Sequence, residues 1–338
     1  MNATRNIVGA LASLAIAACN GSSAQPNGPA DAGGPPVDSG VPPTPAADSA
    51  APAADSATDA SAFSVQTYTS SASGMVDIQV NSHLVLGPTE ALLIDTQLLT
   101  ADAQAVADMV TKSGRKLTTV FLTHAHPDHY LGLAIIQAAF PSAMIVATPG
   151  VLTDFDANAP ATLALLQNAG LAGVIASKLV TPSPLSGNTI TLDGEALQVL
   201  ELPNAGETVH AAALALPGGA LISGDMLMNH VHLYLGECHS DGWQQNLVTV
   251  KAMGFTTFYP GHGQAPADVS VFADDTSYIA GAIPILRAAE ALDASAGDAG
   301  DPRVGAAIGE IAAKFPDFGS QFVLGFSTST FIDTNKCP

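Results

Sequence analysis

The apolar positions of this chain fall into short runs separated by turn residues and amphipathic stretches. Short runs of β-branched and large aliphatic residues predict buried strands, and apolar residues three or four positions apart predict helices. We expect strands at 83–87, 90–96, 117–124, 143–148, 188–194, 196–203 and 256–262, and a hairpin over 211–225 that turns at Pro217-Gly218-Gly219. We expect helices at 101–114, 131–140, 161–170 and 243–254, and over much of 268–315. This order predicts a mixed α/β domain.

The N-terminus has the pattern of an export signal. Residues 1–19 join Arg5 to an apolar run that is too short for a bilayer span, which needs about 20 residues. The stretch Ile16-Ala17-Ala18-Cys19 resembles a bacterial lipobox, which implies a lipid on Cys19 and an outer-membrane lipoprotein that faces the periplasm or the surface. The alternative is an ordinary cleaved signal and a soluble periplasmic or secreted product.

The composition changes sharply at Phe63. Residues 20–62 are rich in Ala, Pro, Gly, Ser and Asp, so they predict a disordered tether that holds the domain away from the membrane. The folded domain is expected over 63–338, with a helical C-terminal extension at about 268–338.

The net charge of the chain limits the classes of molecule that it can bind. Acidic residues outnumber basic residues by 30 to 10, which gives the 338 residues a formal charge of −20. Such a surface repels phosphate backbones, and the few scattered cations form no basic groove, so we expect no nucleic-acid partner. A neutral or apolar small molecule is favoured as the substrate, and the sequence leaves the oligomeric state open.

The segment FLTHAHPDHYLG concentrates metal-binding chemistry between a predicted strand and a predicted helix. It contains His124, His126, Asp128 and His129, and the chain has only nine histidines. A lone histidine is more often a hydrogen-bonded core residue, but four titratable groups this close would be costly to bury without a metal. Imidazole and carboxylate are ligands that zinc, iron and manganese accept, so the segment predicts a metal site.

The motif THAHPDH resembles the HxHxDH signature of the metallo-β-lactamase superfamily. The other ligands of that family are matched by His210 in ELPNAGETVHAAALAL, Asp225 in LISGDML and His262 in TTFYPGHG. The resemblance covers roughly residues 65–270. It implies a four-layer αβ/βα sandwich, in which two mixed sheets are faced by helices and the metals lie at one edge.

The resemblance also implies two divalent metal ions, zinc above all, with iron or manganese as alternatives. His124, His126 and His210 would bind the first metal, and Asp225 would bridge it to the second. Asp128, His129 and His262 would bind the second metal. A hydroxide shared by the metals would attack a carbonyl group.

Two aspartates have further roles in this scheme. Asp128 could also transfer a proton to the leaving group, so Asp128 and Asp225 are the candidate catalytic residues. Asp95, in LLIDT, resembles the family's aspartate at the end of an early strand and would orient the histidine loop, although a turn or cap residue is the alternative.

The stretch MNHVHLYLGECHSDGW (228–243) is the least family-like segment and is expected to shape the substrate pocket. His230, His232, Tyr234 and His239 are its candidate pocket residues, against the alternative of a polar exposed loop. Cys238 lies in the same stretch. In an oxidising compartment it could pair with Cys337 or both could remain free thiols.

An aspartate at position 225 resembles glyoxalase-II-type thioesterases and lactonases, so we expect hydrolysis of an ester, lactone or thioester. The chain lacks Lys and Arg between Asp225 and Trp243, which disfavours glutathione thioesters, and Met228 stands where quorum-quenching lactonases have tyrosine. The alternatives are β-lactam hydrolysis, an oxidoreductase similar to the mononuclear-iron persulfide dioxygenases, and a non-catalytic metal-binding lipoprotein.

Overall fold

The computed structural model describes residues 63–71, 76–203, 206–292 and 302–334. The predicted lipid-bearing Cys19, the segment 20–62 and Cys337 lie outside these residues. Within the described part of the chain, no helix is long and apolar enough to cross a membrane.

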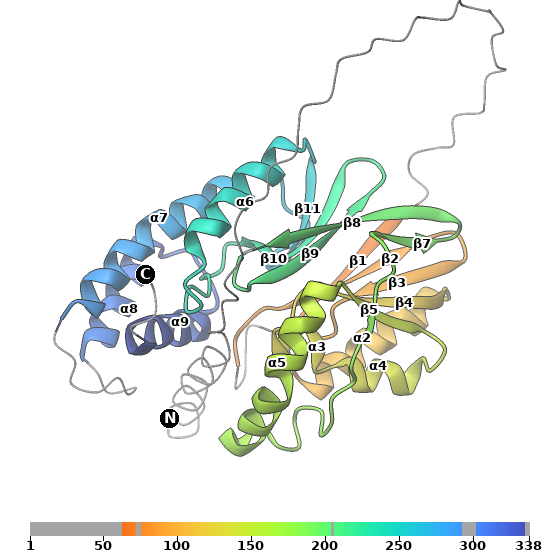
Figure 1. Ribbon diagram of the computed structural model, residues 1–338, viewed down its shortest axis with the longest axis horizontal. Coiled ribbons are helices and arrows are strands. Elements are labelled where there is room, and N and C mark those ends of the chain that lie inside the picture. The colour runs from red at the N-terminus through yellow and green to blue at the C-terminus, as the bar shows by residue number, and fades with distance from the viewer. Residues whose placement is uncertain (1–62, 72–75, 204–205, 293–301, 335–338) are drawn as a thin grey trace, which may run out of the picture.

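Two sheets form the centre of the domain (Figure 1). In the described residues the first sheet has six strands in the order β1-β2-β3-β4-β5-β6: Ser64–Thr69, Asn81–Leu86, Glu90–Ile94, Lys116–Leu122, Met144–Ala147 and Ser183–Pro184. The second has five in the order β11-β10-β9-β8-β7: Thr257–Gly263, Ala220–Asn229, His210–Leu216, Glu195–Pro203 and Thr189–Leu192.

Both sheets are mixed, as the family resemblance implies. In the first sheet β1, β2 and β3 are antiparallel and β3 to β6 are parallel. In the second sheet β7 to β10 are antiparallel, whereas β11 pairs with β10 in parallel. A parallel pair needs a crossover connection, and helices supply it in both sheets.

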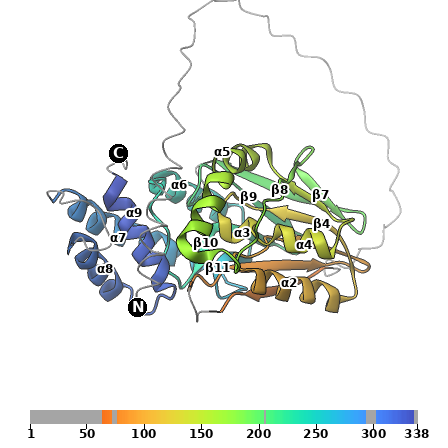
Figure 2. The same cartoon turned by 90° about the horizontal axis from the view of Figure 1, so that it is seen from below.

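Helices lie outside the two sheets (Figures 1 and 2). They are α2 (Thr100–Ser113), α3 (Pro127–Tyr130), α4 (Leu133–Ala139), α5 (Pro149–Leu166) with the π-helical turn η2 (Gln167–Leu171), α6 (Ser240–Ala252), α7 (Val271–Glu290), α8 (Pro302–Lys314) and α9 (Gln321–Thr334). The fold is therefore the predicted four-layer sandwich.

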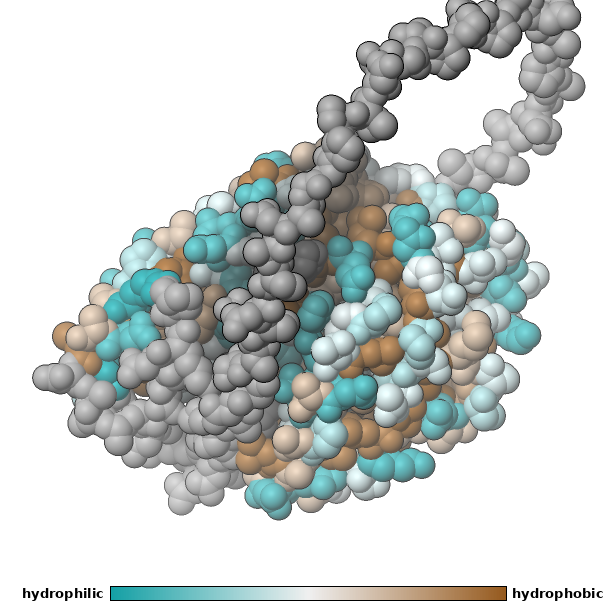
Figure 3. Space-filling model, in the orientation of Figure 1, coloured by the Kyte–Doolittle hydropathy of each residue, from teal (hydrophilic) through white to brown (hydrophobic). Residues whose placement is uncertain are grey.

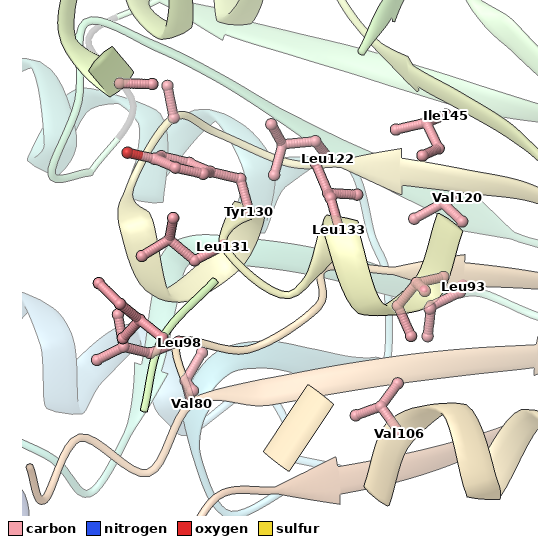
Figure 4. Packing of buried hydrophobic residues seen from close by; sticks show 14 of the residues in the cluster. Val80, Leu93, Leu98, Val106, Val120, Leu122, Tyr130, Leu131, Leu133 and Ile145 are labelled. Carbon is pink, nitrogen blue, oxygen red and sulfur yellow. The ribbon is translucent and has the colours of Figure 1, made fainter. Parts of the chain in front are cut away.

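Three apolar clusters hold the layers together. Phe121 of β4 packs with Leu214 and Ile222 of the second sheet in a cluster between the sheets. A second cluster joins the first sheet to α2, α4 and α5, and Figure 4 shows Val106 of α2 and Leu133 of α4 directed toward β3 and β4. The third cluster joins the second sheet to α6 through α9. On the face in Figure 3, hydrophilic and hydrophobic residues are interspersed.

Several elements differ from the expectations, among them the short helix α3 and the short strand β6, which were not expected. The edge strand β1 was not predicted, since its sequence SVQTYT is largely polar and only partly buried. The helix expected at 161–170 begins earlier, at Pro149, where Thr148 accepts a hydrogen bond from the Val151 amide. Pro160 inside α5 conceals this continuity, because proline usually marks a helix boundary.

Asp275 of α7 is a buried carboxyl group without a cationic partner among the described residues. Its Oδ2 accepts a hydrogen bond from the Met228 amide at 3.1 Å, and its Oδ1 has no hydrogen-bond partner in the part of the chain that the structure describes. Burial raises the pKa of Asp275 well above its usual range, against the opposing effect of the Met228 hydrogen bond. The ionised form therefore costs folding energy.

We predict that Asp275→Asn stabilises the protein at pH 8 by about 1–3 kcal/mol, because the amide carries no charge and still accepts the Met228 hydrogen bond. The gain should shrink as the pH falls toward the unfolded-state pKa of about 3.9, below which the carboxyl is protonated in both states. Urea unfolding at pH 8 and pH 4 measures both values. A difference that does not change with pH would contradict this account.

Candidate metal centre

Strand ends from both sheets meet at one edge of the sandwich. Asp95 directly follows β3, and the segment 123–129 follows β4. An isolated bridge between His124 and Ala211 joins this segment to the start of β9 in the other sheet. His262 lies near the end of β11 and forms a similar bridge with Val80. Residues far apart in sequence therefore share one site.

Two groups of side chains at this edge have the composition of metal-binding sites. In each group, the nitrogen or oxygen atoms that could bind a metal lie within 4.8 Å of one another. The first group contains His124, His126, Glu207 and Asp225, and the second contains Asp128, His129 and His262.

Hydrogen bonds fix the tautomers of three of these histidines. His129 Nδ1 lies 2.8 Å from Asp95 Oδ2, and His262 Nδ1 lies 2.6 Å from the carbonyl oxygen of Ile78. These acceptors require a proton on each Nδ1, which leaves each Nε2 with a lone pair. The Thr123 hydroxyl donates to Asp95 at 2.7 Å, so at 3.0 Å it accepts from His124 Nδ1. His124 Nε2 therefore also carries a lone pair.

The three lone pairs converge on the buried carboxylate of Asp225. Its Oδ1 lies 3.2 Å from His129 Nε2, and its Oδ2 lies 3.1 Å from His262 Nε2 and 3.4 Å from His124 Nε2. Neither carboxylate oxygen has a hydrogen-bond partner among the described residues, and neither does His124 Nε2. Acceptors that face acceptors repel one another, so this arrangement requires protons or cations between them.

The pKa shifts have the same cause. Burial lowers the pKa of His129, but the charges of Asp225, Asp128 and Asp95 outweigh it and raise that pKa to about 10. Burial raises the pKa of Asp225, yet the charges of His129, His262 and His124 hold it well below its usual range. The site thus strongly attracts positive charge. Two divalent cations fit this donor set, because imidazole nitrogen and carboxylate oxygen are their usual ligands.

His126 lies between two carboxylates that the sequence analysis did not select. Its Nδ1 is 3.0 Å from Glu207 Oε2, and its Nε2 is 3.0 Å from Glu237 Oε1. Burial lowers the pKa of His126, but the hydrogen bonds with Glu207 and Glu237 raise it well above the usual range. The Oε1 of Glu207 accepts the Tyr234 amide at 3.1 Å, which directs Oε2 toward His126.

His210 lies outside both groups, in contrast to the sequence expectation. Its Nδ1 is 3.0 Å from Asp154 Oδ1, and its amide donates to Asp154 Oδ2 at 3.0 Å. His210 begins β9, whereas Glu207 lies in the turn before the strand, and this turn faces the cluster. Glu207 lies three residues before His210, so the sequence contains two candidate ligands at this point. The superfamily pattern has a histidine here, and it therefore pointed to His210 and not to Glu207.

Asp95 lies where the prediction placed it. It follows β3, is 2% exposed, and accepts hydrogen bonds from His129 and from both the amide and the hydroxyl of Thr123. It therefore orients the histidine loop directly and is not a surface turn residue.

A cavity of about 790 Å³ opens over the two groups. His232, Tyr234 and His239 line it, as expected for pocket residues, together with Glu237. His230 does not line it: its side chain is 54% exposed and its Nε2 lies 3.8 Å from Asp274. Cys238 also lines the cavity and is disulfide-bonded. Its expected partner Cys337 lies outside the described residues.

A comparison with family models matches residues 75–262 to the metallo-β-lactamase superfamily. The chain belongs to this superfamily. Among curated proteins, none matches it significantly. Solved structures of the superfamily share its fold. A metallo-β-lactamase family protein from Thermus thermophilus is 23% identical with a TM-score of 0.52, and the match covers 74% of this chain and 86% of that one.

A metallo-β-lactamase from Pontibacter korlensis is 16% identical with a TM-score of 0.52, covering 65% of this chain and 95% of that one. At these identities the likeness extends to the fold alone. The superfamily match ends at His262, so α7, α8 and α9 lie beyond it.

We predict that Asp95→Asn weakens zinc binding about 10–100-fold, because an amide cannot accept all three hydrogen bonds that hold the histidine loop. Competition with a chromophoric chelator measures the affinity. The matched control is Asp108→Asn on the exposed face of α2, where the carboxylate accepts a hydrogen bond from Gln104 at 3.1 Å. Equal zinc affinities for both variants would show that Asp95 does not support the metal site.

We also predict that Gly261→Ala reduces bound metal, because a Cβ at position 261 would overlap Asp225 Oδ1 and displace that carboxylate. Gly305→Ala in α8 is the control, since a Cβ there meets nothing within 4 Å. Elemental analysis after dialysis measures the metal, and circular dichroism checks the fold. Full metal content in Gly261→Ala would show that Asp225 is not needed as a ligand.

Proposed function

We propose that this protein is a dinuclear metallo-hydrolase that cleaves a neutral or apolar ester, lactone or thioester. The observation that carries the proposal is the convergence of three histidine lone pairs on the buried carboxylate of Asp225, next to a large cavity that is lined by His126, Asp128, Glu207 and His262. Such a buried set of acceptors suits a pair of cations, and a cavity above it suits a substrate.

The proposed ligand set differs from the sequence expectation at one position. The first metal would be held by His124 Nε2, His126 Nδ1 and a Glu207 oxygen, so Glu207 replaces His210. The second would be held by Asp128, His129 and His262. Asp225 lies between the groups and would serve both. The set is richer in oxygen than the predicted one, so zinc, manganese and iron all remain suitable.

When bound, the metals would supply a water of lowered pKa as nucleophile and a Lewis acid for the carbonyl oxygen. The side chains of the protein position the metal-binding imidazoles and transfer a proton. Asp95 and Glu237 orient the imidazoles of His129 and His126. Asp128 lines the cavity, with its Oδ2 3.3 Å from His262 Nε2, and can carry a proton from the nucleophile to the leaving group.

The chemistry of the cavity favours an uncharged substrate. Among the described residues, its charged lining groups are carboxylates and histidines, and neither Lys nor Arg contributes. Asp154 and Glu237 remain outside the proposed ligand set and add negative charge near the metals. An anionic substrate would be repelled by these carboxylates, and neither Lys nor Arg among the described lining residues would bind it.

We further propose that the protein is exported and held at the outer membrane by a lipid on Cys19. The lipobox-like stretch and the polar segment 20–62 support this location. Mass spectrometry of the N-terminal peptide tests it, since a diacylated cysteine adds two fatty acyl chains, and an unmodified N-terminus after Ala17 would identify an ordinary secreted product.

We predict that Glu207→Gln loses one metal equivalent or binds it at least about tenfold more weakly, because a neutral amide is a poor ligand. His210→Gln is the matched variant and should keep full metal content. Elemental analysis with isothermal titration distinguishes them. The reverse pattern would restore His210 as the ligand.

The function itself is tested by metal content and a turnover screen beside Asp225→Ala and His126→Ala. The screen includes a nitrophenyl ester, an acyl-homoserine lactone, a thioester and a chromogenic cephalosporin. Two metal equivalents, with turnover that both variants lose, would support the proposal. Turnover of the cephalosporin alone would indicate a β-lactamase. One iron with oxygen consumption on persulfides, or bound metal without turnover, would overturn the proposal.

A further inference from the structure

One wall of the cavity comes from a helix outside the superfamily match. Phe322, Val323 and Phe326 of α9, the dark blue helix in Figure 1, line the cavity with half-buried side chains. They recur at intervals of one, three and four residues, which places them on one face of the helix. The superfamily scaffold supplies the metal ligands, whereas the end of the chain supplies this apolar wall.

The α9 residues belong to a continuous apolar surface. They pack against the cluster that contains Val76, Ile78, Leu98, Leu166 and Leu171, and each of these five residues also lines the cavity. The surface therefore combines the segment before β2, the loop after β3, the end of α5 and α9. Apolar residues from four places in the sequence form one lining.

This apolar surface begins next to the proposed metal ligands. The ring of Tyr234 lies 6.0 Å from that of His126 and stacks on Phe326 with centroids 4.9 Å apart and an interplanar angle of 7°. On the other side, the carbonyl oxygen of Ile78 accepts the hydrogen bond of His262. A group bound on this surface would thus continue directly from a carbonyl held over the metals.

Hydrogen bonds donated by backbone amides fix α9 against the segment 231–238. The Leu235 amide donates to Ser327 Oγ at 2.8 Å, and the His232 amide donates to the carbonyl oxygen of Gly319 at 3.0 Å. These bonds join the 231–238 segment, which carries Tyr234 and Glu237, to α9 and the turn before it. The surface is therefore preorganised for a ligand, which lowers the entropic cost of binding.

We propose that this surface binds an unbranched aliphatic acyl chain, so that the substrate is an ester, lactone or thioester of a medium-length fatty acid. The inference rests on the proposed function, because it extends from the same catalytic site. The lining provides apolar contact without a described Lys or Arg, which suits a chain without an anionic end. The cavity of about 790 Å³ exceeds what an acetyl group needs.

Binding is tested first, with ligands that cannot be hydrolysed. We would titrate the metal-loaded full chain with the alcohols from butan-1-ol to decan-1-ol and measure the heat of binding. Affinity should rise about fourfold for each added CH2 group, as expected when a methylene leaves water. Val323→Trp, which fills the cavity, should weaken decan-1-ol binding at least about tenfold. Val248→Trp on α6 is the matched control, because Val248 is 65% exposed.

Turnover is tested next, with nitrophenyl esters from acetate to decanoate. The specificity constant kcat/KM should rise with chain length, and Val323→Trp should remove that rise, whereas Val248→Trp should keep both the rise and the acetate hydrolysis of the unsubstituted chain. Phe322→Ala, which widens the cavity, should move the preferred length to longer chains and provides a second test if the tryptophan variant fails to fold.

The outcomes separate the two proposals. Ester turnover with a flat chain-length profile, unaffected by either α9 variant, would overturn the acyl-chain site and leave the hydrolase standing. Binding of decan-1-ol that Val323→Trp abolishes, with no turnover of any ester, lactone or thioester, would support the apolar site and overturn the hydrolase. If the alcohols do not bind and none of the substrates is hydrolysed, both the acyl-chain site and the hydrolase would be overturned.

Discussion

The hydrogen bonds accepted by Asp95 are the constraint on which the rest of the site depends. This buried carboxylate holds His129 directly and reaches His124 through the hydroxyl of Thr123. One side chain thereby fixes the tautomers of histidines in both metal-binding groups. Asp95 follows β3, a strand paired on both sides in the first sheet, and has a left-handed φ of 60°. The local strain is offset by the core packing and by the three hydrogen bonds.

The sequence predicted those parts of the molecule that depend on local pattern. The buried strands from 83 to 124 have continuous apolar runs, because both of their faces are covered, and the structure contains them. The HAHPDH loop, Asp225 and His262 come together as the superfamily resemblance implied. The four residues of the loop could be predicted because they are close in sequence. Asp225 and His262 could be predicted because each lies at the end of a predicted strand.

Features that depend on tertiary contacts were missed. Nothing in the sequence around Glu207 marks it as a ligand, and only the path of the turn before β9 brings its carboxylate to His126. Glu237 has no nearby motif and reaches His126 across 111 residues of sequence. The role of α9 in the cavity could not be inferred either, because the distant segments that it meets carry no mark of this contact in their sequences.

The position of α9 at the end of the chain has a consequence for biosynthesis. A chain made from its N-terminus contains every proposed ligand once residue 262 has emerged, but the wall formed by Phe322, Val323 and Phe326 comes later. The helices α7 and α9 also supply buried residues, such as Phe272 and Leu324, to the core that covers the second sheet. The ligand-bearing strands therefore cannot complete their packing before α9 has been made, so the metal centre and the apolar wall are parts of one folding unit.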